Sequence, residues 1–412
     1  MTTGLRFVTL LSKSVLVFGL AFWLTPADVA AYGLVAAYSG LATYLVNADF
    51  YSYSTRLIAK GERSTWAATL RGHVQFLIVQ TGLFLLVTTP IWLFTDLAAG
   101  QFGWVVVLAI IEALGLDLAR ILTAMGSPFF SNVVLFVRAG TWPLPLLLAV
   151  WLVPGLRSVQ TVFVVWLVLD ALGVGLGVVG IWRKRLVGWH TRLGWPWFRR
   201  GIKIAATFLF ATLMLRALFS IDRELVLRFA GENRVAAYTV YAGVAQAMTA
   251  LLEAGVFSYT YPALLRAHAT ADRQAYSKAL VAMARGVAVV VAFFAVCAVI
   301  LLPILLGYIP NPTYRSFLGD FHILLAAQAV YNLSMIPHYV LYAGDRDRWI
   351  VASHVVAFAG FLAGSFGLHA LGVDAAVPWG VLAGFAAMLC VKLLGVAKSG
   401  GWNPVPAVAE VG

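Results

Sequence analysis

The chain has 412 residues, of which 62% are hydrophobic and only 11% are charged. An average soluble domain carries roughly 25% charged residues, so this composition excludes a soluble globule and indicates a protein that resides in lipid. The net charge of +12 does not require nucleic acid, because basic loops on one side are typical of membrane proteins. The two cysteines, Cys297 and Cys390, lie in separate apolar stretches without a CxxC motif. Neither a disulfide framework nor a metal site is therefore predicted.

Twelve stretches of the chain are apolar over about 20 residues, which is the length that a helix needs to cross a bilayer. The loops between them are short, and none could hold a soluble domain. The first stretch lacks a small-residue cleavage site, so we expect it to be a retained helix. The predicted spans lie near residues 7–24, 30–56, 74–94, 103–122, 132–153, 160–182, 203–228, 235–262, 286–307, 314–342, 349–369 and 375–397.

The orientation of these spans follows from the basic residues of the loops. Lys and Arg resist translocation and gather on the cytoplasmic side. With the N-terminus inside, the outer loops keep only Arg157, Arg234 and Arg315. The inner loops collect Arg56, Lys60, Arg63, Arg71, Arg183, Lys184, Arg185, Arg192, Arg199, Arg200, Lys203, Arg266, Arg273, Lys278, Arg285, Arg346 and Arg348. We therefore predict a multi-pass protein with both termini in the cytoplasm.

The two halves of the chain resemble one another. Residues 29–55 align with residues 235–261 without a gap, which places "VAAY" on "VAAY" and Ser52-Tyr53 on Ser258-Tyr259. Six spans in each half make a parallel repeat about an axis along the membrane normal. We predict an all-α polytopic protein of two pseudo-symmetric six-helix lobes, residues 1–182 and 204–412. The basic segment 183–203 would join them as an interfacial helix that places its tryptophans at the headgroups.

Charged residues inside predicted spans are candidates for a substrate pathway, because an ionisable group costs at least about 2.5 kcal/mol near the bilayer centre. Lys13 lies in the first span, and Arg216 and Arg223 lie in the seventh, about two helical turns apart. An inward-facing Arg/Lys set suits a diphosphate. The alternative for Arg216 is a structural ion pair with Glu253 of the eighth span, and Arg223 could pair locally with its acidic neighbours.

The stretch "NADFYSYSTR" (47–56) places charges at the cytoplasmic end of the second span. On a continuous helix Asp49, Tyr53 and Arg56 share one face. In the repeat, Ser52-Tyr53 recurs, whereas Asp49 and Arg56 are replaced by Gly255 and Pro262. We expect the aromatic pair to belong to the scaffold. The two charges are candidates for gating or headgroup contact, or they form a simple interfacial anchor.

Other intramembrane acids are expected to pair within the protein. Asp117 and Arg120 are three residues apart and should neutralise each other, and Glu112 should find Arg138 of the fifth span.

Asp170 has no local partner, which makes it a candidate proton or cation site. Asp320 and His322 lie near the outer end of the tenth span, and His338 and His354 are expected deeper in the membrane. Together they could relay protons, although histidines in a packed helix bundle are more often structural.

Two sequence patterns bear on whether the chain binds a nucleotide. "GLGVVG" (175–180) fits the dinucleotide pattern GxGxxG, but it lies inside an apolar stretch, where close helix packing through Gly173 and Gly177 explains it better. The chain has no GxxxxGK[ST] motif, so we expect no ATP binding of that kind and no cofactor. The energy would then come from an ion gradient such as that of protons or sodium, from the membrane potential, or from consumption of the product.

Two stretches resemble the polysaccharide transporter family, the Wzx-type flippases of the MOP exporter superfamily, which also holds the MATE drug exporters. They are "LTPADVAAYGLVAAYSGL" (24–41) and "SIDRELVLRFAGENRVAAYTVYAGV" (220–244). Ala31 and Ala237 stand where that family has a small glycine before the tyrosine. The resemblance implies a twelve-helix exporter that works by alternating access, with the first, second, seventh and eighth spans lining its cavity.

The resemblance also implies a function. The protein would move a lipid-linked oligosaccharide, on a polyprenyl diphosphate carrier, across the bacterial inner membrane, with the bilayer and a glycan polymerase machinery as partners. The alternative is a MATE-type drug/cation antiporter, which would require an acidic cavity. A membrane glycan polymerase or glycosyltransferase is less favoured, because such enzymes need a sizeable outer loop, so we expect no enzyme.

Overall fold

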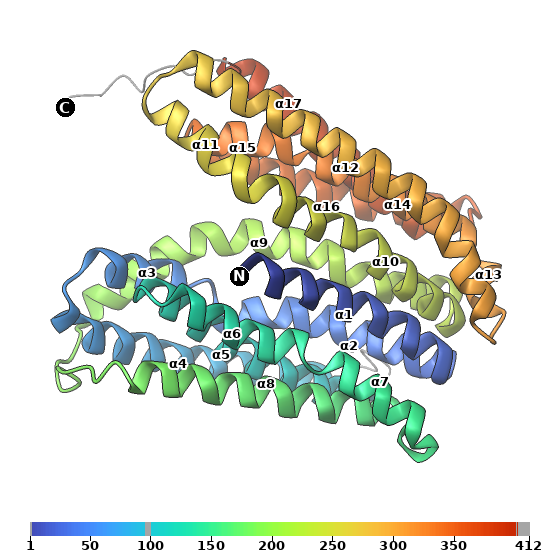
Figure 1. Ribbon diagram of the computed structural model, residues 1–412, viewed down its shortest axis with the longest axis horizontal. Helices are drawn as coiled ribbons and strands as arrows, with labels where there is room; N and C mark the ends of the chain where they lie inside the picture. Colours follow the sequence, from blue (N-terminus) through green and yellow to red (C-terminus); the bar gives the residue numbers. More distant parts are fainter. Residues whose placement is uncertain (1, 95–99, 401, 403–412) are drawn as a thin grey trace. The chain divides into compact units, whose positions relative to one another are not determined.

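A computed structural model describes residues 2–94, 100–400 and 402, and all regular secondary structure in these ranges is helical (Figure 1). The predicted all-α fold class is confirmed. The chain divides into two compact units, Met1–Glu224 and Leu225–Gly412. This division falls inside helix α9, whereas the sequence predicted lobes on either side of segment 183–203.

The first unit contains nine helices within the described residues, the last of which continues into the second unit. They are α1 (Thr2–Trp23), α2 (Pro26–Asn47), α3 (Tyr51–Lys60), α4 (Arg63–Phe94), α5 (Phe102–Ala124), α6 (Pro128–Gly140), α7 (Pro143–Leu152), α8 (Val159–Trp182) and α9 (Trp195–Ala230). Proline occupies the first turn of α2, α6 and α7, where a missing N–H costs nothing.

The second unit contains eight further helices within the described residues. They are α10 (Glu232–Leu252), α11 (Ser258–Ala269), α12 (Arg273–Tyr308), α13 (Thr313–Ser316), α14 (Leu318–Leu333), α15 (Met335–Ala343), α16 (Asp347–Ala370) and α17 (Ala376–Ser399). A π-helical turn, Glu253–Phe257, joins α10 to α11.

Each of the twelve predicted ranges falls on a helix or on consecutive helices. Eight described helices are long and apolar enough to span a membrane, or nine if the bent pair Trp195–Ala206 and Leu209–Ala230 forms one span. The chain is therefore a multi-pass membrane protein, and the count of twelve spans stays a prediction.

One local expectation from the sequence stays a prediction and another is wrong. Residues 183–194 form turns and irregular structure, and α9 begins at Trp195 with a part, Trp195–Ala206, that is bent against the rest of the helix. An interfacial position of this segment stays a prediction. The second span is not one continuous helix, because Ala48 and Asp49 adopt left-handed conformations with φ of 47° and 52°. Such values are uncommon for residues other than glycine, and they end α2 at Asn47. Asp49 thus does not share a helical face with Tyr53 and Arg56.

The internal repeat is visible in the packing of each unit. In the first unit α2 packs against α5, and α5 packs against α8; in the second, α10 packs against α14, and α14 packs against α17. The second predicted span thus contacts the fourth, and the fourth contacts the sixth, in both halves. The equivalent of Ala48 and Asp49 is Ala254 and Gly255, which lie inside the π-helical turn. Both repeats therefore interrupt their second helix at the same place.

Glycines permit the closest helix crossings. Helices α16 and α17 run side by side (Figure 1), and each carries a pair of glycines four residues apart, Gly360 with Gly364 and Gly380 with Gly384. Small residues at this spacing let two helix backbones approach in lipid. In α8, a Cβ at Gly177 would lie 3.1 Å from Leu118. The expectation that "GLGVVG" serves close packing is confirmed.

We expect Gly380→Ala to destabilise the second unit. A Cβ at this position would lie 2.7 Å from the Ser365 backbone nitrogen and 2.9 Å from the Phe361 carbonyl oxygen, so α16 and α17 must separate. The expected cost is about 1–3 kcal/mol, measured as a lower midpoint of thermal unfolding in detergent. Gly367→Ala on α16 is the matched control, because a Cβ there meets nothing within 4 Å. Equal midpoints for the two variants would contradict the argument.

Candidate functional site

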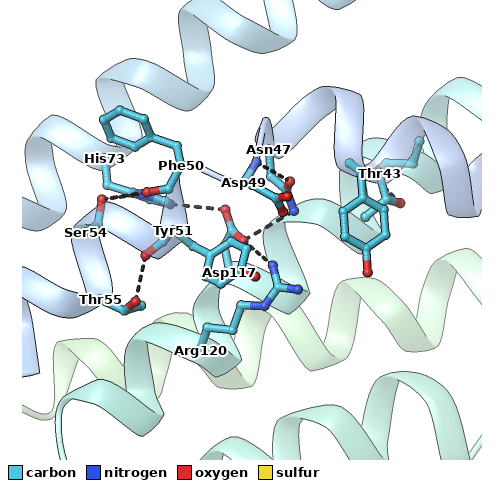
Figure 2. A network of polar contacts seen from close by, with 12 residues as sticks. Thr43, Asn47, Asp49, Phe50, Tyr51, Ser54, Thr55, His73, Asp117 and Arg120 are labelled. Atoms are coloured by element: carbon cyan, nitrogen blue, oxygen red, sulfur yellow. Dashed lines mark hydrogen bonds and ion pairs between the residues drawn. The ribbon is translucent and has the colours of Figure 1, made fainter. Parts of the chain in front are cut away.

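A buried polar network surrounds the break between α2 and α3 (Figure 2). Asp117 of α5 lies at its centre and is 1% exposed. Its carboxylate accepts from Asn47 Nδ2 (3.5 Å) and Arg120 Nη1 (3.3 Å) and contacts His73 Nε2 (3.2 Å). The other ring nitrogen of His73 is 3.0 Å from Ser54 Oγ. The predicted Asp117–Arg120 pair is confirmed, and α2, α3 and α4 add partners that sequence spacing could not reveal.

Asp49 lies beside this network and is 3% exposed. Its backbone N–H donates to Asn47 Oδ1 (3.2 Å), which helps to hold the left-handed turn. Its own Oδ1 is buried and has no hydrogen-bond partner within the described structure. A buried carboxylate oxygen without a donor, on a strained backbone, is a feature that clusters at functional sites. Asp49 is therefore the strongest candidate in this region for exchanging a proton or a cation.

Tyr53 and Arg56 both lie on α3. Tyr53 is 6% exposed and packs against Phe50 and Trp197, with ring centroids 5.9 Å and 5.2 Å away. Arg56 is exposed on α3. Arg120 belongs to the network, and its guanidinium lies 3.6 Å from the centre of the Tyr51 ring.

A second charged cluster joins α5, α6 and α8. Arg138 Nε donates to Asp170 Oδ1 at 2.8 Å, and its Nη2 lies 3.7 Å from Glu112 Oε1. The predicted Glu112–Arg138 pair is confirmed. Asp170 has no partner near it in the sequence, as expected, and its partner Arg138 comes from a different helix. Its second oxygen, Oδ2, is buried without a hydrogen-bond partner among the described residues, so one acceptor position stays open.

Two basic residues inside predicted spans of the first unit, Lys13 and Arg216, are exposed. Lys13 of α1 is exposed and interacts electrostatically with Glu112, Arg138 and Asp170. Arg216 of α9 is exposed, and its Nη2 donates to the Tyr44 hydroxyl at 3.0 Å. The guanidinium also lies 4.8 Å from the centre of the Tyr44 ring. Within the described residues Tyr44 is the recorded partner of Arg216, and no carboxylate forms an ion pair with it.

Two further charged residues were candidates for substrate contact, Arg223 of α9 and Glu253 of the second unit. Arg223 is 8% exposed, and its Nη1 lies 3.0 Å from Asp222 Oδ1, so the arginine pairs locally. Glu253 is exposed at the first position of the π-helical turn in the second unit.

In the second unit Asp320 is held by a bidentate ion pair. Arg234 Nε and Nη2 each donate to one Asp320 oxygen at 2.7 Å, and Asp320 is 3% exposed. His322 is exposed and contacts the ring of Phe321, with centroids 5.7 Å apart. The structure therefore does not bring His322 into contact with Asp320. A bidentate pair of this kind fixes α10 to α14.

Lys392 of α17 was not among the residues singled out from the sequence, although it is a charged residue inside a predicted span. It is 0% exposed, and its Nζ donates to Ser334 Oγ at 3.2 Å. His338 and His354 stack near it with ring centroids 6.4 Å apart, and His338 Nδ1 is buried without a hydrogen-bond partner in the described structure. No carboxylate pairs with Lys392 in this part of the structure.

No group of three or more His, Cys, Asp or Glu residues that could hold a metal ion occurs in the residues that the structure describes.

The Arg138 cluster makes a prediction about stability. Arg138→Leu would leave Asp170 and Glu112 without their cation and should lower the free energy of unfolding by about 3–5 kcal/mol. Asp170→Asn leaves Arg138 paired with Glu112 and should cost clearly less. Chemical or thermal unfolding of the two variants in detergent measures the difference. A larger loss for Asp170→Asn would show that Arg138 is not the residue on which the cluster depends.

The burial of Lys392 leads to a second prediction about stability. Burial of an ammonium group without a carboxylate is costly, so Lys392→Met, which keeps a chain of similar length, should raise the midpoint of thermal unfolding. A lower midpoint for Lys392→Met would show that the buried ammonium group is compensated within the protein, and it would overturn this interpretation.

Comparisons with known proteins support the fold. No protein-family model matches the chain, and no curated protein matches it. Among solved structures, the inward-facing conformation of a multidrug resistance MATE family transporter of the MOP superfamily is similar with a TM-score of 0.74 and 12% identity. That match covers 98% of this chain and 100% of the other.

Two further structures are similar over nearly the whole chain. A MATE transporter in the bent conformation has a TM-score of 0.64 and 11% identity, covering 97% of this chain and 94% of the other. The outward-facing conformation of a multidrug resistance MATE family transporter has a TM-score of 0.59 and 12% identity, covering 97% and 95%. At such identity the likeness concerns the fold alone. This chain has the fold of the MATE transporters of the MOP superfamily.

Proposed function

We propose that the protein is a membrane transporter that works by alternating access. The observation that carries this proposal is the similarity to MATE transporters over 98% of the chain. Transporters of this fold have been seen in both inward-facing and outward-facing conformations. The division of this chain into two units with the same helix packing is the arrangement on which such a mechanism depends.

The charge pattern of the first unit favours an anionic substrate. Asp117 and Asp170 are buried and engaged with basic partners, and Asp49 is buried. Arg216 is exposed and held by Tyr44. An exposed guanidinium on an apolar helix offers a fork to a phosphate, whereas Asp49, Asp117 and Asp170 are too buried to meet a cation from the solvent. We therefore propose a lipid-linked oligosaccharide with a phosphate-bearing carrier as the substrate.

In this proposal Arg216 binds a phosphate oxygen, and the Tyr44 hydroxyl orients the guanidinium. Lys13 supplies a second positive charge on α1. Arg223 is left out of the substrate contacts, because Asp222 engages it. Asp49 and Asp170, each with an unpartnered buried oxygen, are the groups at which a proton or sodium ion would couple to the movement. The protein would act in a bacterial inner membrane, with both termini in the cytoplasm and glycan polymerase machinery as a partner.

Drug/cation antiport is the second candidate. Two of the solved structures named above are multidrug resistance transporters, and this comparison favours antiport over flipping. The exposed carboxylate of Glu253 in the second unit is the feature that would suit a cationic drug. The two candidate functions differ in the charge of the substrate, so one reconstituted preparation can distinguish between them.

We expect proteoliposomes containing the wild-type protein to move a fluorescent lipid-linked oligosaccharide between leaflets. The Arg216→Ala variant should lose this activity by about tenfold or more, because a charge-assisted hydrogen bond contributes about 1.5–3 kcal/mol. Arg199→Ala, an exposed arginine of the same helix outside the apolar stretch, is the matched control and should keep full activity. Thermal unfolding checks that both variants fold.

Tyr44→Phe sharpens the same test. It keeps the ring under the guanidinium but removes the hydroxyl, so it should slow the movement less than Arg216→Ala does. Efflux of a cationic dye by the same vesicles, sensitive to Glu253→Gln and indifferent to Arg216→Ala, would instead establish antiport. Wild-type flipping by Arg216→Ala would remove Arg216 from the substrate site.

A further inference from the structure

A large groove lies between α4 and α9 in the first unit. Its volume is about 1020 Å³, at the upper end of the roughly 300–1,000 Å³ of small-molecule sites. Apolar side chains line most of it, including Ile78, Val79 and Leu83 of α4 and Leu209 of α9. The three α4 residues are 51–66% exposed, so the groove opens on the side that α4 presents outward. In a bilayer such a surface meets lipid chains.

The end of the groove is built by a close approach between distant segments. A Cβ at Gly72 would lie 2.7 Å from Leu193 and 2.9 Å from Trp197. Glycine therefore lets the turn before α9 and the first turn of α9 pack directly onto α4. Trp197 in turn packs with Phe50 and Tyr53 at the start of α3. The groove is thus fixed at this end and is part of the fold.

The same end carries two arginines that line the groove, Arg71 and Arg192. Arg71 Nη1 donates to the Trp189 carbonyl oxygen at 2.8 Å, which orients the guanidinium and leaves its other nitrogens available. Arg192 is exposed. Arg71 lies just before the apolar stretch that begins at Val74, so both charges belong at the level of the lipid headgroups. Basic pockets between membrane helices are suited to anionic headgroups.

The length of the groove decides which lipid it fits. From Arg71 to Leu83 the helix rises about 18 Å at 1.5 Å per residue. One leaflet contributes about half of a hydrocarbon core of roughly 30 Å. The groove therefore matches an acyl chain of one leaflet that begins at a headgroup, and it is too short to contain a long polyprenyl chain.

We propose that this groove is a binding site for an anionic phospholipid, with the phosphate on Arg71 and Arg192 and one acyl chain along α4 and α9. This site is separate from the Arg216 contact and does not depend on the nature of the transported substrate. A lipid seated here would hold α9 against α4 and so stabilise the first unit.

The test titrates dioctanoyl phosphatidylglycerol into the full-length protein in an uncharged detergent and follows the midpoint of thermal unfolding. Binding to the folded state raises this midpoint. Two control probes test the parts of the phospholipid separately. Dioctanoylglycerol has the acyl chains without the phosphate, and inorganic phosphate has no acyl chain. We expect only the complete phospholipid to raise the midpoint strongly.

The Arg71→Gln/Arg192→Gln variant should lower the apparent affinity for phosphatidylglycerol by about tenfold or more, because two charge-assisted hydrogen bonds are lost. The matched control is Arg183→Gln/Arg185→Gln, which removes the same charge from two arginines that line a separate hollow at the end of α8. A generic electrostatic effect would weaken binding equally in both variants and would overturn the proposal.

Ala206→Trp tests the apolar part of the site without touching the arginines. Ala206 lines the groove and is exposed, so the indole should fill the space of the chain and abolish the stabilisation by phosphatidylglycerol. Undiminished stabilisation in this variant, or an equal rise with dioctanoylglycerol, would place the lipid elsewhere. A rise with a polyprenyl phosphate but not with phosphatidylglycerol would assign the groove to a different lipid and contradict the proposal.

Discussion

The structure depends on one constraint, the cost of a charge that has no partner in hydrocarbon. Water cannot compensate polar groups inside the bilayer, so each buried ion must find its partner on another helix. Arg138 shows how strongly this couples the first unit: it joins α6 to Asp170 of α8 and to Glu112 of α5. The space that it needs exists because α8 has glycine opposite it. A Cβ at Gly173 would lie 2.8 Å from the Arg138 Cβ. Charge pairing and close helix packing are therefore parts of one arrangement in this unit.

The same constraint explains why the sequence predicted some contacts and missed others. Asp117 with Arg120, and Arg223 with Asp222, are neighbours along one helix, where residue spacing alone fixes the distance. The Glu112–Arg138 pair could be proposed because the two spans are consecutive. Arg234 with Asp320 and Arg138 with Asp170 depend on which helices lie together, which one sequence does not reveal. Lys392 could have been noticed as a charge in an apolar span, but its complete burial depends on how α14, α15 and α16 surround α17.

The break after Asn47 shows a different limit of reasoning from periodicity. A helical wheel places Asp49, Tyr53 and Arg56 on one face only if the backbone stays helical. The left-handed conformations of Ala48 and Asp49 turn the chain, so Tyr53 packs inward and Asp49 faces the network of α5. Glycine is the residue that usually predicts a left-handed turn, so alanine and aspartate at these positions do not predict one. The surroundings of this turn include Asn47 of α2, His73 of α4 and Asp117 of α5, which come from three different helices.

The two repeats interrupt their second helix in different ways, and this difference bears on function. In the second unit the equivalent positions are Ala254 and Gly255, and the chain passes through a π-helical turn without a left-handed residue. The fold thus tolerates a break at this place without an aspartate and without a left-handed residue, although α10 and α14 share a polar contact of their own beside it, from Thr249 to Asn332. In the first unit the break carries a strained backbone and a buried carboxylate oxygen that lacks a donor. Both features cost stability, and the repeat shows that the architecture does not demand them. A cost that the fold does not require, confined to one of two equivalent sites, supports the proposal that Asp49 exchanges an ion.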